Sequence, residues 1–418
     1  MGGSLMQLVA IGAQNTYITG NPQITFFKAI YHRYTNFVIE SIGHTFDGQL
    51  GFNKTIVCSI PRKGDLLYKT YLELDLELPE KIDSDGNVKN VDLVKRAGIA
   101  MISHIDFEIG GQIIDKHYGE WMDIWSQLSM TREDYSKFER MVDFSISSKN
   151  NLKKVYIPLF FWFTKQPGLA LPLIALQYHE VKLIVTFNKY NSICKEFPNF
   201  KKPKINSCCL FTDYIFLDTD ERRRFSKNDH EYLIEQVQVG IRSELPIQRD
   251  SVNLYLNFNH PCKEIFWTCQ SEIFRKVSTK DYDNPYFEPF CYCNGNEFLP
   301  DHVRKALLIL NGNDRFYENN GKYFRLIQPF QHHTGGYNQS INTDDCQGFI
   351  YNYSFAMNPE EYQPSGTCNF SRIDTAVLKL ILDEFSYKDS EKKYIHVYAT
   401  NYNILKISSG MGGLTYSN

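Results

Sequence analysis

In the heptapeptide VKLIVTF (Val181–Phe187), large apolar side chains occupy every second position. Because successive side chains of a strand point to opposite faces, this alternation predicts a half-buried β-strand. A second segment, SGTCNFSRIDTAVLKLIL (Ser365–Leu382), ends in a similar run. Each alternating run is preceded by a stretch that contains Pro or Gly and then by several polar residues. The two segments therefore indicate that one β architecture occurs twice in this chain.

Two further landmarks recur at nearly the same spacing. The segments IDFEIGGQII and KALLILNGNDRF both predict hairpins, and the Asn-Gly pair of the second is typical of a type I′ turn. Gly111 and Gly312 of these segments are 201 residues apart (312 minus 111). Pro61 and Pro261 are 200 apart (261 minus 61). A repeat of this length is too long for a solenoid and indicates a duplicated domain.

Length and composition favour the same arrangement. The 418 residues suffice for two domains of about 200 residues each. Aromatic residues make up 15% of the chain, with 30 Phe and 27 Tyr, and such side chains suit a pleated sheet. The predicted fold class is all-β, with two consecutive eight-stranded antiparallel jelly-roll sandwiches (a double jelly roll) and short helices in loops. The predicted divisions are an N-terminal docking segment (1–24), a first jelly roll (25–216) and a second jelly roll with a C-terminal tail (217–418).

Individual segments lead to more local predictions. The clearest strand is TYLELDLEL, in which Glu73, Asp75 and Glu77 alternate with leucines and form a solvated face rather than a metal site. A second strand, YIPLFFWF, is expected to be buried on both faces. The apolar run at Gln23–Tyr34 is too short to distinguish helix from strand. The other expectations are strands at Val252–Phe258 and Tyr394–Ile407, a long surface excursion at Asp123–Asn151 and a polar loop at Asn319–Asp345.

Both ends of the chain lack charge. Met1–Phe27 contains no charged side chain, yet polar residues and glycines interrupt it, which excludes a signal peptide and a membrane span as interpretations. Ile407–Asn418 is also uncharged and rich in glycine. Both ends are therefore interpreted as docking segments, with disorder as the alternative.

Charge and cysteine content exclude other classes. A net charge of -3 gives no basic field for nucleic acid. The arginine run Arg222–Arg224 could contact phosphate, but its neighbouring carboxylates favour local ion pairs. The ten cysteines form no CxxC pair, which favours reduced thiols in a cytosolic setting.

No enzyme motif is present, and no catalytic, cofactor-binding or metal-ligating residue is assigned. The CxC pair Cys291 and Cys293 and the pair His332 and His333 could be zinc ligands, but loop thiols and surface imidazoles are the favoured interpretation. An Arg and an Asp two residues apart on an expected strand suggest a structural ion pair. This pair is Arg372 and Asp374. The possible glycan acceptors, of which Asn338 is favoured, are Asn53, Asn338, Asn352 and Asn369.

Several long segments, taken together and in this order, resemble the double jelly-roll major capsid proteins of nucleocytoplasmic large DNA viruses, the iridovirus, phycodnavirus and giant-virus type. The resemblance runs from about Gly2 to Asn418. The segments that carry it are LMQLVAIGAQNTYITGNPQITFFKAIYHRYTNF, IPRKGDLLYKTYLELDLELP, IGGQIIDKHYGEWMDIW, FWFTKQPGLALPLIALQYHEV, YIFLDTDERRRF, FNHPCKEIFW, QPSGTCNFSRID and VYATNYNILKISSGMGGLTYSN.

The resemblance implies a structural protein of the virion without cofactors or enzymatic activity. Three chains would form a pseudo-hexagonal capsomer that tiles an icosahedral capsid assembled in the host cytoplasm. The implied partners are two further copies, neighbouring capsomers, penton and minor capsid proteins and, as a further candidate, the internal viral membrane, without direct contact to nucleic acid. Only modest outward towers are expected. The alternatives are a minor capsid or scaffold paralogue of the same fold and a jelly-roll carbohydrate-binding protein.

Overall fold

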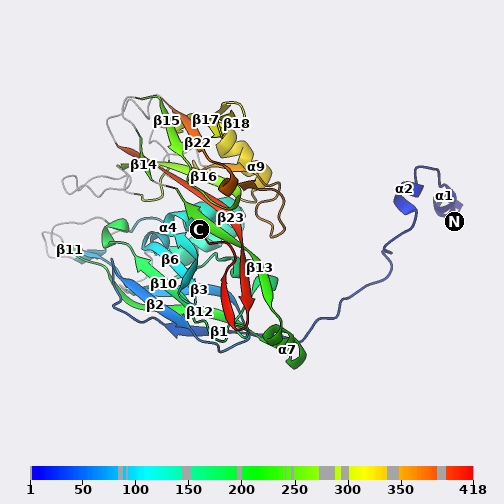
Figure 1. Cartoon of the computed structure of the whole chain (residues 1–418), viewed down its shortest axis with the longest axis horizontal. Coiled ribbons are helices and arrows are strands. Elements are labelled where there is room, and N and C mark those ends of the chain that lie inside the picture. Colours follow the sequence, from blue (N-terminus) through cyan, green and yellow to red (C-terminus); the bar gives the residue numbers. More distant parts are fainter. Residues whose placement is uncertain are drawn as a thin grey trace. The chain divides into compact units, whose positions relative to one another are not determined.

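A computed structural model of the protein describes residues 2–82, 88–90, 93–143, 152–194, 200–240, 242–245, 249–272, 288–292, 301–336, 348–383 and 392–417. Two compact units, Met1–Asn36 and Phe37–Asn418, make up the chain. All the long strands belong to the second unit (Figure 1). Within the described residues, no helix is both long and apolar enough to cross a membrane.

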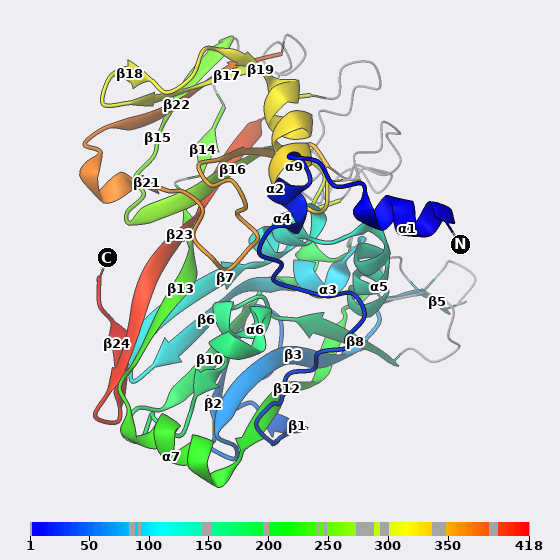
Figure 2. The same ribbon diagram turned by 90° about the vertical axis from the view of Figure 1, so that its right-hand side faces the viewer.

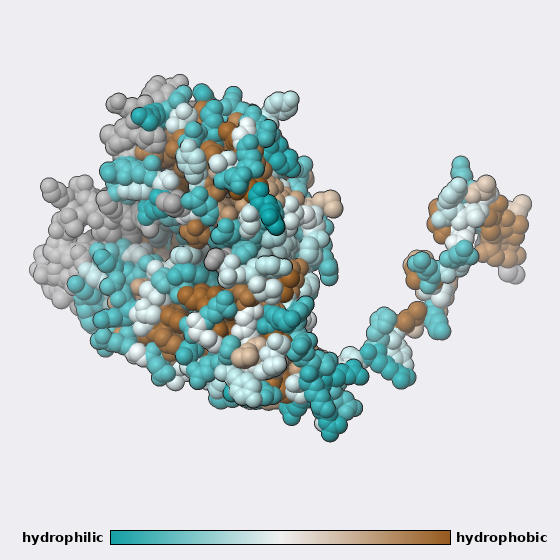
Figure 3. All heavy atoms as spheres, viewed as in Figure 1, coloured by the Kyte–Doolittle hydropathy of each residue, from teal (hydrophilic) through white to brown (hydrophobic). Residues whose placement is uncertain are grey.

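The first unit contains two short helices, α1 (Gly2–Val9) and α2 (Thr16–Thr19). The expectation of a helix or strand at Gln23–Tyr34 is wrong, because this segment has neither. Short apolar runs become regular when they pack against a partner, and neither helix of this unit buries a side chain. The unit therefore has no core of its own, and apolar residues form much of its surface in Figure 3.

The second unit begins with a sandwich of two antiparallel sheets. One sheet has the strand order β1-β12-β3-β8, and the other has the order β2-β10-β6-β7. The bounds are β1 Phe37–Thr45, β12 Lys204–Leu217, β3 Leu66–Glu77, β8 Leu152–Pro158, β2 Thr55–Ile60, β10 Val181–Phe187, β6 Ile102–Ile109 and β7 Gln112–Tyr118. The short strand β9 (Leu171–Pro172) pairs with β3, and β11 (Phe200–Lys201), β4 (Glu80–Ile82) and β5 (Val88–Asn90) form a small separate sheet.

A second sandwich follows with the sheets β13-β23-β16-β20 and β15-β22-β17-β18. The bounds are β13 His230–Val239, β23 Lys393–Ser408, β16 Pro261–Ser271, β20 Tyr351–Ser354, β15 Ser251–Tyr255, β22 Ala376–Leu382, β17 Val303–Leu310 and β18 Asn313–Asp314. The short strands β14 (Ser243–Glu244), β19 (Asn319–Asn320), β21 (Cys368–Asn369) and β24 (Met411–Leu414) pair at the margins.

The two sandwiches have one topology. If the eight principal strands of each are counted in chain order, both sandwiches have the orders 1-8-3-6 and 2-7-4-5. β10 and β22, each seventh in its sandwich, show the same alternation of buried and half-buried side chains. The predicted pair of eight-stranded jelly rolls is confirmed.

The two hairpin landmarks occupy equivalent places, and the two prolines occupy neighbouring ones. Gly110 and Gly111 (φ 58° and 85°) connect β6 to β7, and Asn311 and Gly312 (φ 47° and 78°) connect β17 to β18. Positive φ at both central residues is the type I′ geometry, which suits a Gly or an Asn. Pro61 follows the second principal strand of its sandwich, and Pro261 begins the third. The offset of about 200 residues therefore marks one structural repeat.

All of the predicted strand TYLELDLEL except its last residue, Leu78, lies within β3, and its leucines fill the first core. Leu72, Leu74 and Leu76 are fully buried, and each such side chain contributes about 1.5–3 kcal/mol to folding. The alternating acidic residues are half-buried on the other face. Lys154 approaches Glu73 at 2.9 Å, and Lys201 approaches Glu77 at 2.8 Å.

The expected strand YIPLFFWF is only partly correct. β8 ends at Pro158, and its Tyr156 is 38% exposed, so this strand is not buried on both faces. The chain then turns into α6 (Trp162–Lys165). Phe161 and Trp162 pack on Phe107, with ring centroids 5.3 and 5.4 Å away. These aromatic residues do not continue the strand, because their side chains pack into the core beside the sheet.

The prediction of a long surface excursion at Asp123–Asn151 is wrong for its first part. Two helices, α4 (Gly119–Ser129) and α5 (Arg132–Val142), occupy the β7–β8 connection, and nearly all of α4 is buried. Apolar residues at helical spacing give α4 a face that must be covered. Residues 144–151 lie outside the described part.

The polar loop expected at Asn319–Asp345 is also partly wrong. η3 (Tyr323–Ile327), which is a π-helix, and α9 (Gln328–His332) follow β19. Phe324 is fully buried and anchors this segment in the second core. The remaining short helices are α3 (Ala97–Ala100), η1 (Pro167–Leu169), η2 (Tyr190–Ser192) and η4 (Phe370–Arg372).

The helix α7 (Thr219–Lys227) connects β12 to β13, and the Asp218 side chain caps its first turn. Arg222 of this helix pairs with Asp65 of the first sandwich at 2.9 Å. The C-terminal tail also contacts the first sandwich, because the Tyr178 amide donates to the Gly410 carbonyl at 2.9 Å. The tail is therefore docked within the chain.

Candidate functional site: the junction between the two sandwiches

The helix α4 leaves the first sandwich and lies on the outer face of the second. Trp121 contacts Phe266 of β16 and Tyr398 of β23, with ring centroids 5.2 and 5.8 Å apart. Phe266 and Tyr398 are directly opposite in the sheet register. Their neighbours Ile265 and Trp267 point into the second core, so the Phe266–Tyr398 pair faces outward. One sandwich thus provides the cover for an aromatic pair of the other.

The second sandwich caps the end of this helix. The last carbonyls of a helix lack intrahelical donors and need other partners. The Gly335 amide donates to the Leu128 carbonyl at 2.7 Å, and the Gly336 amide donates to the Gln127 carbonyl at 2.9 Å. A Cβ atom at Gly335 would lie 2.5 Å from the Leu128 oxygen, so only glycine fits. Figure 2 shows α9, which precedes these glycines, beside α4.

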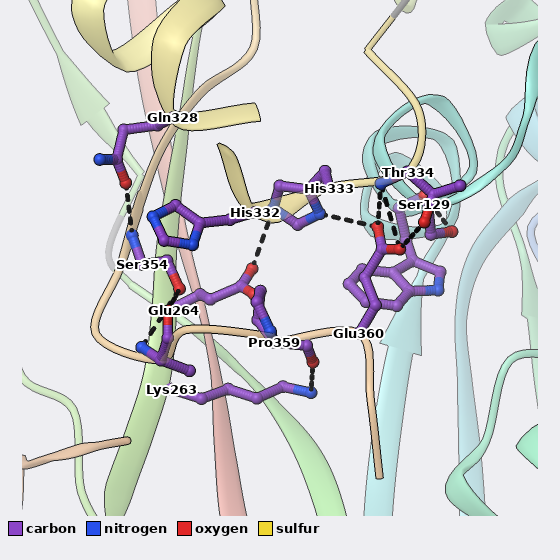
Figure 4. A network of polar contacts seen from close by, with 12 residues as sticks. Ser129, Lys263, Glu264, Gln328, His332, His333, Thr334, Ser354, Pro359 and Glu360 are labelled. Atoms are coloured by element: carbon purple, nitrogen blue, oxygen red, sulfur yellow. Dashed lines mark hydrogen bonds and ion pairs between the residues drawn. The ribbon is translucent and has the colours of Figure 1, made fainter. Parts of the chain in front are cut away.

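A buried chain of charges runs through the same junction (Figure 4). Lys263 of β16 is fully buried, and its Nζ lies 2.7 Å from Glu235 Oε2 and donates to the Pro359 carbonyl at 2.6 Å. Lys165, from α6 of the first sandwich, also pairs with Glu235. Burial lowers the pKa of Lys263, although the Glu235 carboxylate opposes this shift. Glu235 therefore joins cations from both sandwiches.

His333 continues this chain between two carboxylates. Its Nδ1 donates to Glu360 Oε1 at 2.9 Å, and its Nε2 lies 3.3 Å from Glu264 Oε2. Burial alone would lower the pKa of His333, but Glu264 and Glu360 outweigh burial and raise this pKa to about 9. With His333 protonated, the network contains three cations (Lys165, Lys263 and His333) and three carboxylates (Glu235, Glu264 and Glu360). Such a balance lowers the cost of burying each charge.

A second buried node holds α4 to the first sandwich. Asp123 is fully buried, and it accepts hydrogen bonds from Arg96 Nη1 at 2.6 Å and from Gln127 Nε2 at 2.9 Å. Burial raises the pKa of Asp123 to about 6, although the Arg96 guanidinium opposes the rise. The Gln127 Oε1 accepts from the Gly348 amide at 2.9 Å. Gln127 therefore connects this node to the second sandwich.

The histidine and cysteine pairs lie in different surroundings. His333 belongs to the charge network, whereas His332 Nδ1 lies 2.9 Å from the Met357 carbonyl. Cys291 is buried, and Cys293 lies outside the described residues. Among the residues that the structure describes, no group of three or more His, Cys, Asp or Glu could hold a metal ion.

The suggested ion pair and glycan acceptors also have defined places. Arg372 ends η4 and Asp374 precedes β22, so neither lies on a strand as expected, and both are exposed. No ion pair between them occurs in the described part of the chain. Asn352 is fully buried in β20, whereas Asn53 and Asn369 are exposed. Asn338 lies outside the described residues.

No pattern in the sequence predicts the junction network. Its six members come from five separate places in the chain and form no motif. The one local signal is the charged pair Lys263 and Glu264, which immediately precedes the apolar residues IFW. A charged pair in a buried strand needs partners from elsewhere.

Two like jelly rolls that share a buried junction define a double jelly-roll protein. The solved structures with this fold include a quasi-atomic model of the PBCV-1 virus capsid, with a TM-score of 0.77 and 35% identity over 94% of this chain and 100% of that one. The Faustovirus major capsid protein shares the fold at 12% identity, with a TM-score of 0.71 over 97% and 96% of the two chains.

Residues 25–218 match the family model for the major capsid protein N-terminus, and residues 221–413 match that for the large eukaryotic DNA virus major capsid protein. The major capsid proteins of Pyramimonas orientalis virus and Paramecium bursaria Chlorella virus 1 are 43% and 39% identical, each over the whole of both chains. The chain belongs to the major capsid proteins of large eukaryotic DNA viruses. It is thus a structural protein of the virion capsid and not an enzyme.

Proposed function

We propose that three copies of this chain form a pseudo-hexagonal capsomer, which tiles the icosahedral shell of a large double-stranded DNA virus. The observation that carries this proposal is the identical strand order of the two sandwiches. A ring of three chains presents six similar lobes, and cyclic symmetry needs only one kind of contact between copies. The lobe limits of 25–216 and 217–418 stay a prediction; the strands of the first lobe run from Phe37 to Leu217, and α7 follows them.

The buried junction supports this role. A tile needs a fixed angle between its two lobes, and α4 provides buried contacts on both sides of the junction. Separating the lobes would expose Trp121 and leave Lys165 without Glu235. The lobes therefore act as one building block.

The first unit provides the contact with the inside of the shell. Its large apolar residues are exposed, and a surface of this kind is typical of a docking segment. We place it on the inner side of the capsomer, against minor capsid proteins or the internal membrane. Neighbouring capsomers and penton proteins contact the flanks, and nucleic acid is not a direct partner. The exposed residues are Leu5, Met6, Leu8, Val9, Ile11, Tyr17, Ile18, Ile24, Phe26, Phe27, Ile30, Tyr31 and Tyr34.

Light scattering after size-exclusion chromatography tests the trimer. We expect a mass three times that of the chain. A stable monomer at micromolar concentration would contradict the capsomer.

A truncation tests the first unit separately. Deleting Met1–Pro22 removes α1 and α2 and leaves both sandwiches intact. We expect a soluble trimer that does not form shells when it is mixed with the other capsid components. Electron microscopy of the assembly reaction gives the readout, with the full chain as control. Shells of normal appearance from the truncated chain would refute this role.

A further inference from the structure

The π-helix η3 and the helix α9, which follows it directly, present an apolar face to the surface. Phe330 of α9 is 86% exposed, and Ile327 and Leu326 of η3 are 46% and 42% exposed. Residues three and four positions apart share one side of a helix, so these side chains form a single patch. Their neighbours Phe324 and Pro329 are buried and hold the segment against the second sandwich. The patch therefore sits on an anchored element and is available to a partner.

The place of α9 in the repeat identifies its counterpart. η3 and α9 lie between β18 and β20, the fifth and sixth principal strands of the second sandwich. α4 lies between β7 and β8, the fifth and sixth principal strands of the first. Both sandwiches thus insert helices at the same point. The Trp121 side of α4 is covered by the second sandwich, whereas the Phe330 side of α9 is exposed.

The surface that covers α4 also has a counterpart. Phe266 is the sixth residue of β16, and Tyr71 is the sixth residue of the equivalent strand β3. Each is directly opposite an aromatic residue of the eighth principal strand, Tyr398 in one case and Phe211 in the other. The Tyr71 and Phe211 rings stack with centroids 5.2 Å apart. The first sandwich therefore carries its own outward aromatic pair.

Tyr71 of this second aromatic pair borders a groove. Tyr71 and the nearby Tyr156 line a cavity of about 420 Å³ together with Met141 of α5, and Tyr156 is partly exposed. The lining is largely apolar, and Lys69 is its one charged residue among those that the structure describes. An apolar helix face could enter without leaving a carboxylate unpaired. The complete lining is Lys69, Thr70, Tyr71, Met141, Tyr156, Pro158, Leu159, Phe160 and Thr164.

We propose that α9 of one copy docks in the Tyr71 groove of the next copy. This contact repeats between chains the contact that α4 makes within a chain. It is head-to-tail, and such contacts close into a ring when each step turns by a fixed fraction of a circle. Two kinds of equivalent contact, one inside the chain and one between chains, then hold six lobes together. The inference rests on the proposed trimer and names the surfaces that form it.

Substitutions at the two surfaces test the contact. Phe330→Asp and Tyr156→Glu change exposed side chains, so each variant should keep the circular dichroism spectrum of the wild type. We expect each variant to raise the protein concentration at which half of the chains are trimeric by at least about tenfold. Loss of a central aromatic anchor typically weakens an interface by this much. Tyr255→Asp is the matched control. Tyr255 is 69% exposed on β15, in the sheet β15-β22-β17-β18 of the second sandwich, and takes no part in the proposed contact. It should leave trimer formation unchanged.

A charge pair tests direct contact. Phe330→Lys and Tyr156→Glu should each weaken the trimer, and their combination in one chain should weaken it less than the sum of the single effects. A photoreactive benzoylphenylalanine at position 330 should cross-link two chains, at peptides that contain Tyr71 or Tyr156.

The outcomes separate the two proposals. A monomeric wild type would refute the trimer, and the docking contact with it. A wild-type trimer that Phe330→Asp leaves unchanged, or cross-links that map to another surface, would overturn the docking contact while the trimer stands.

Discussion

Replacing Gly335 by Ala tests whether the glycine cap of α4 holds the two sandwiches together. The added methyl group would meet three backbone atoms, the Leu128 and Gln127 oxygens at 2.5 and 2.6 Å and the Leu128 carbon at 2.7 Å. Backbone cannot rotate away as a flexible side chain can, so the loop must move. The movement breaks the hydrogen bonds of 2.7 and 2.9 Å that Gly335 and Gly336 donate.

Each broken bond leaves a carbonyl at the buried end of α4 without its donor, at a cost of about 1–3 kcal/mol. With partial relaxation of the loop, we expect the variant to lose about 2–4 kcal/mol of unfolding free energy. Urea denaturation followed by tryptophan fluorescence measures the loss. Hydrogen exchange at the amides of Gly336 and Gly348 should accelerate in parallel, because both amides bond to Gln127.

Gly168→Ala is the matched control. Gly168 lies in η1, is exposed, and has nothing within 4 Å of the added Cβ. Such a change usually alters stability by under about 1 kcal/mol and often raises it. If Gly335→Ala were as stable as Gly168→Ala, the cap would contribute nothing and the reasoning would be refuted.

Three further predictions concern the junction and the cores. Trp121→Ala should cost about 3–5 kcal/mol by urea denaturation, since it opens a cavity against Phe266 and Tyr398; a cost below 1 kcal/mol would show that α4 does not anchor the sandwiches. The two carboxylates raise the folded pKa of His333 to about 9 from its ordinary value of 6.5, so its stabilisation is complete below pH 6.5 and is lost as pH rises through 9. This difference in pKa corresponds to roughly 3 kcal/mol, and His333→Gln should flatten the stability profile across that window; an unchanged profile would contradict the assignment. Burial raises the pKa of the Cys58 and Cys194 thiols to about 12, so both should resist iodoacetamide at pH 8 in the native protein and react after unfolding, as mass spectrometry of the peptides would show.

Local patterns were sufficient for the duplicated strands. The alternation in VKLIVTF and AVLKLIL and the Asn311-Gly312 turn depend on side chains that are close in sequence, and the structure confirms both. The helical insertions were harder to predict. α4 has polar residues among its apolar ones, and its burial depends on Phe266 and Tyr398, which are far away in the chain.

The junction network shows the same limit. Glu235 lies in a strand whose own sequence gives no reason for a buried carboxylate. The reason is the approach of Lys165 and Lys263 from two other elements. Sequence spacing cannot reveal such a convergence, whereas the pair Lys263 and Glu264 in an apolar strand at least indicates that buried partners must exist.

The position of α4 has a consequence for the growing polypeptide on the ribosome. Trp121 is translated 277 residues before Tyr398, which covers it (398 minus 121). At about 5–20 residues per second, this tryptophan waits roughly 14–55 seconds for its partner. During that interval the nascent first lobe exposes the apolar face of α4. The yield of folded chains in an infected cell therefore depends on how quickly the ribosome completes the second lobe, or on a chaperone that binds the first.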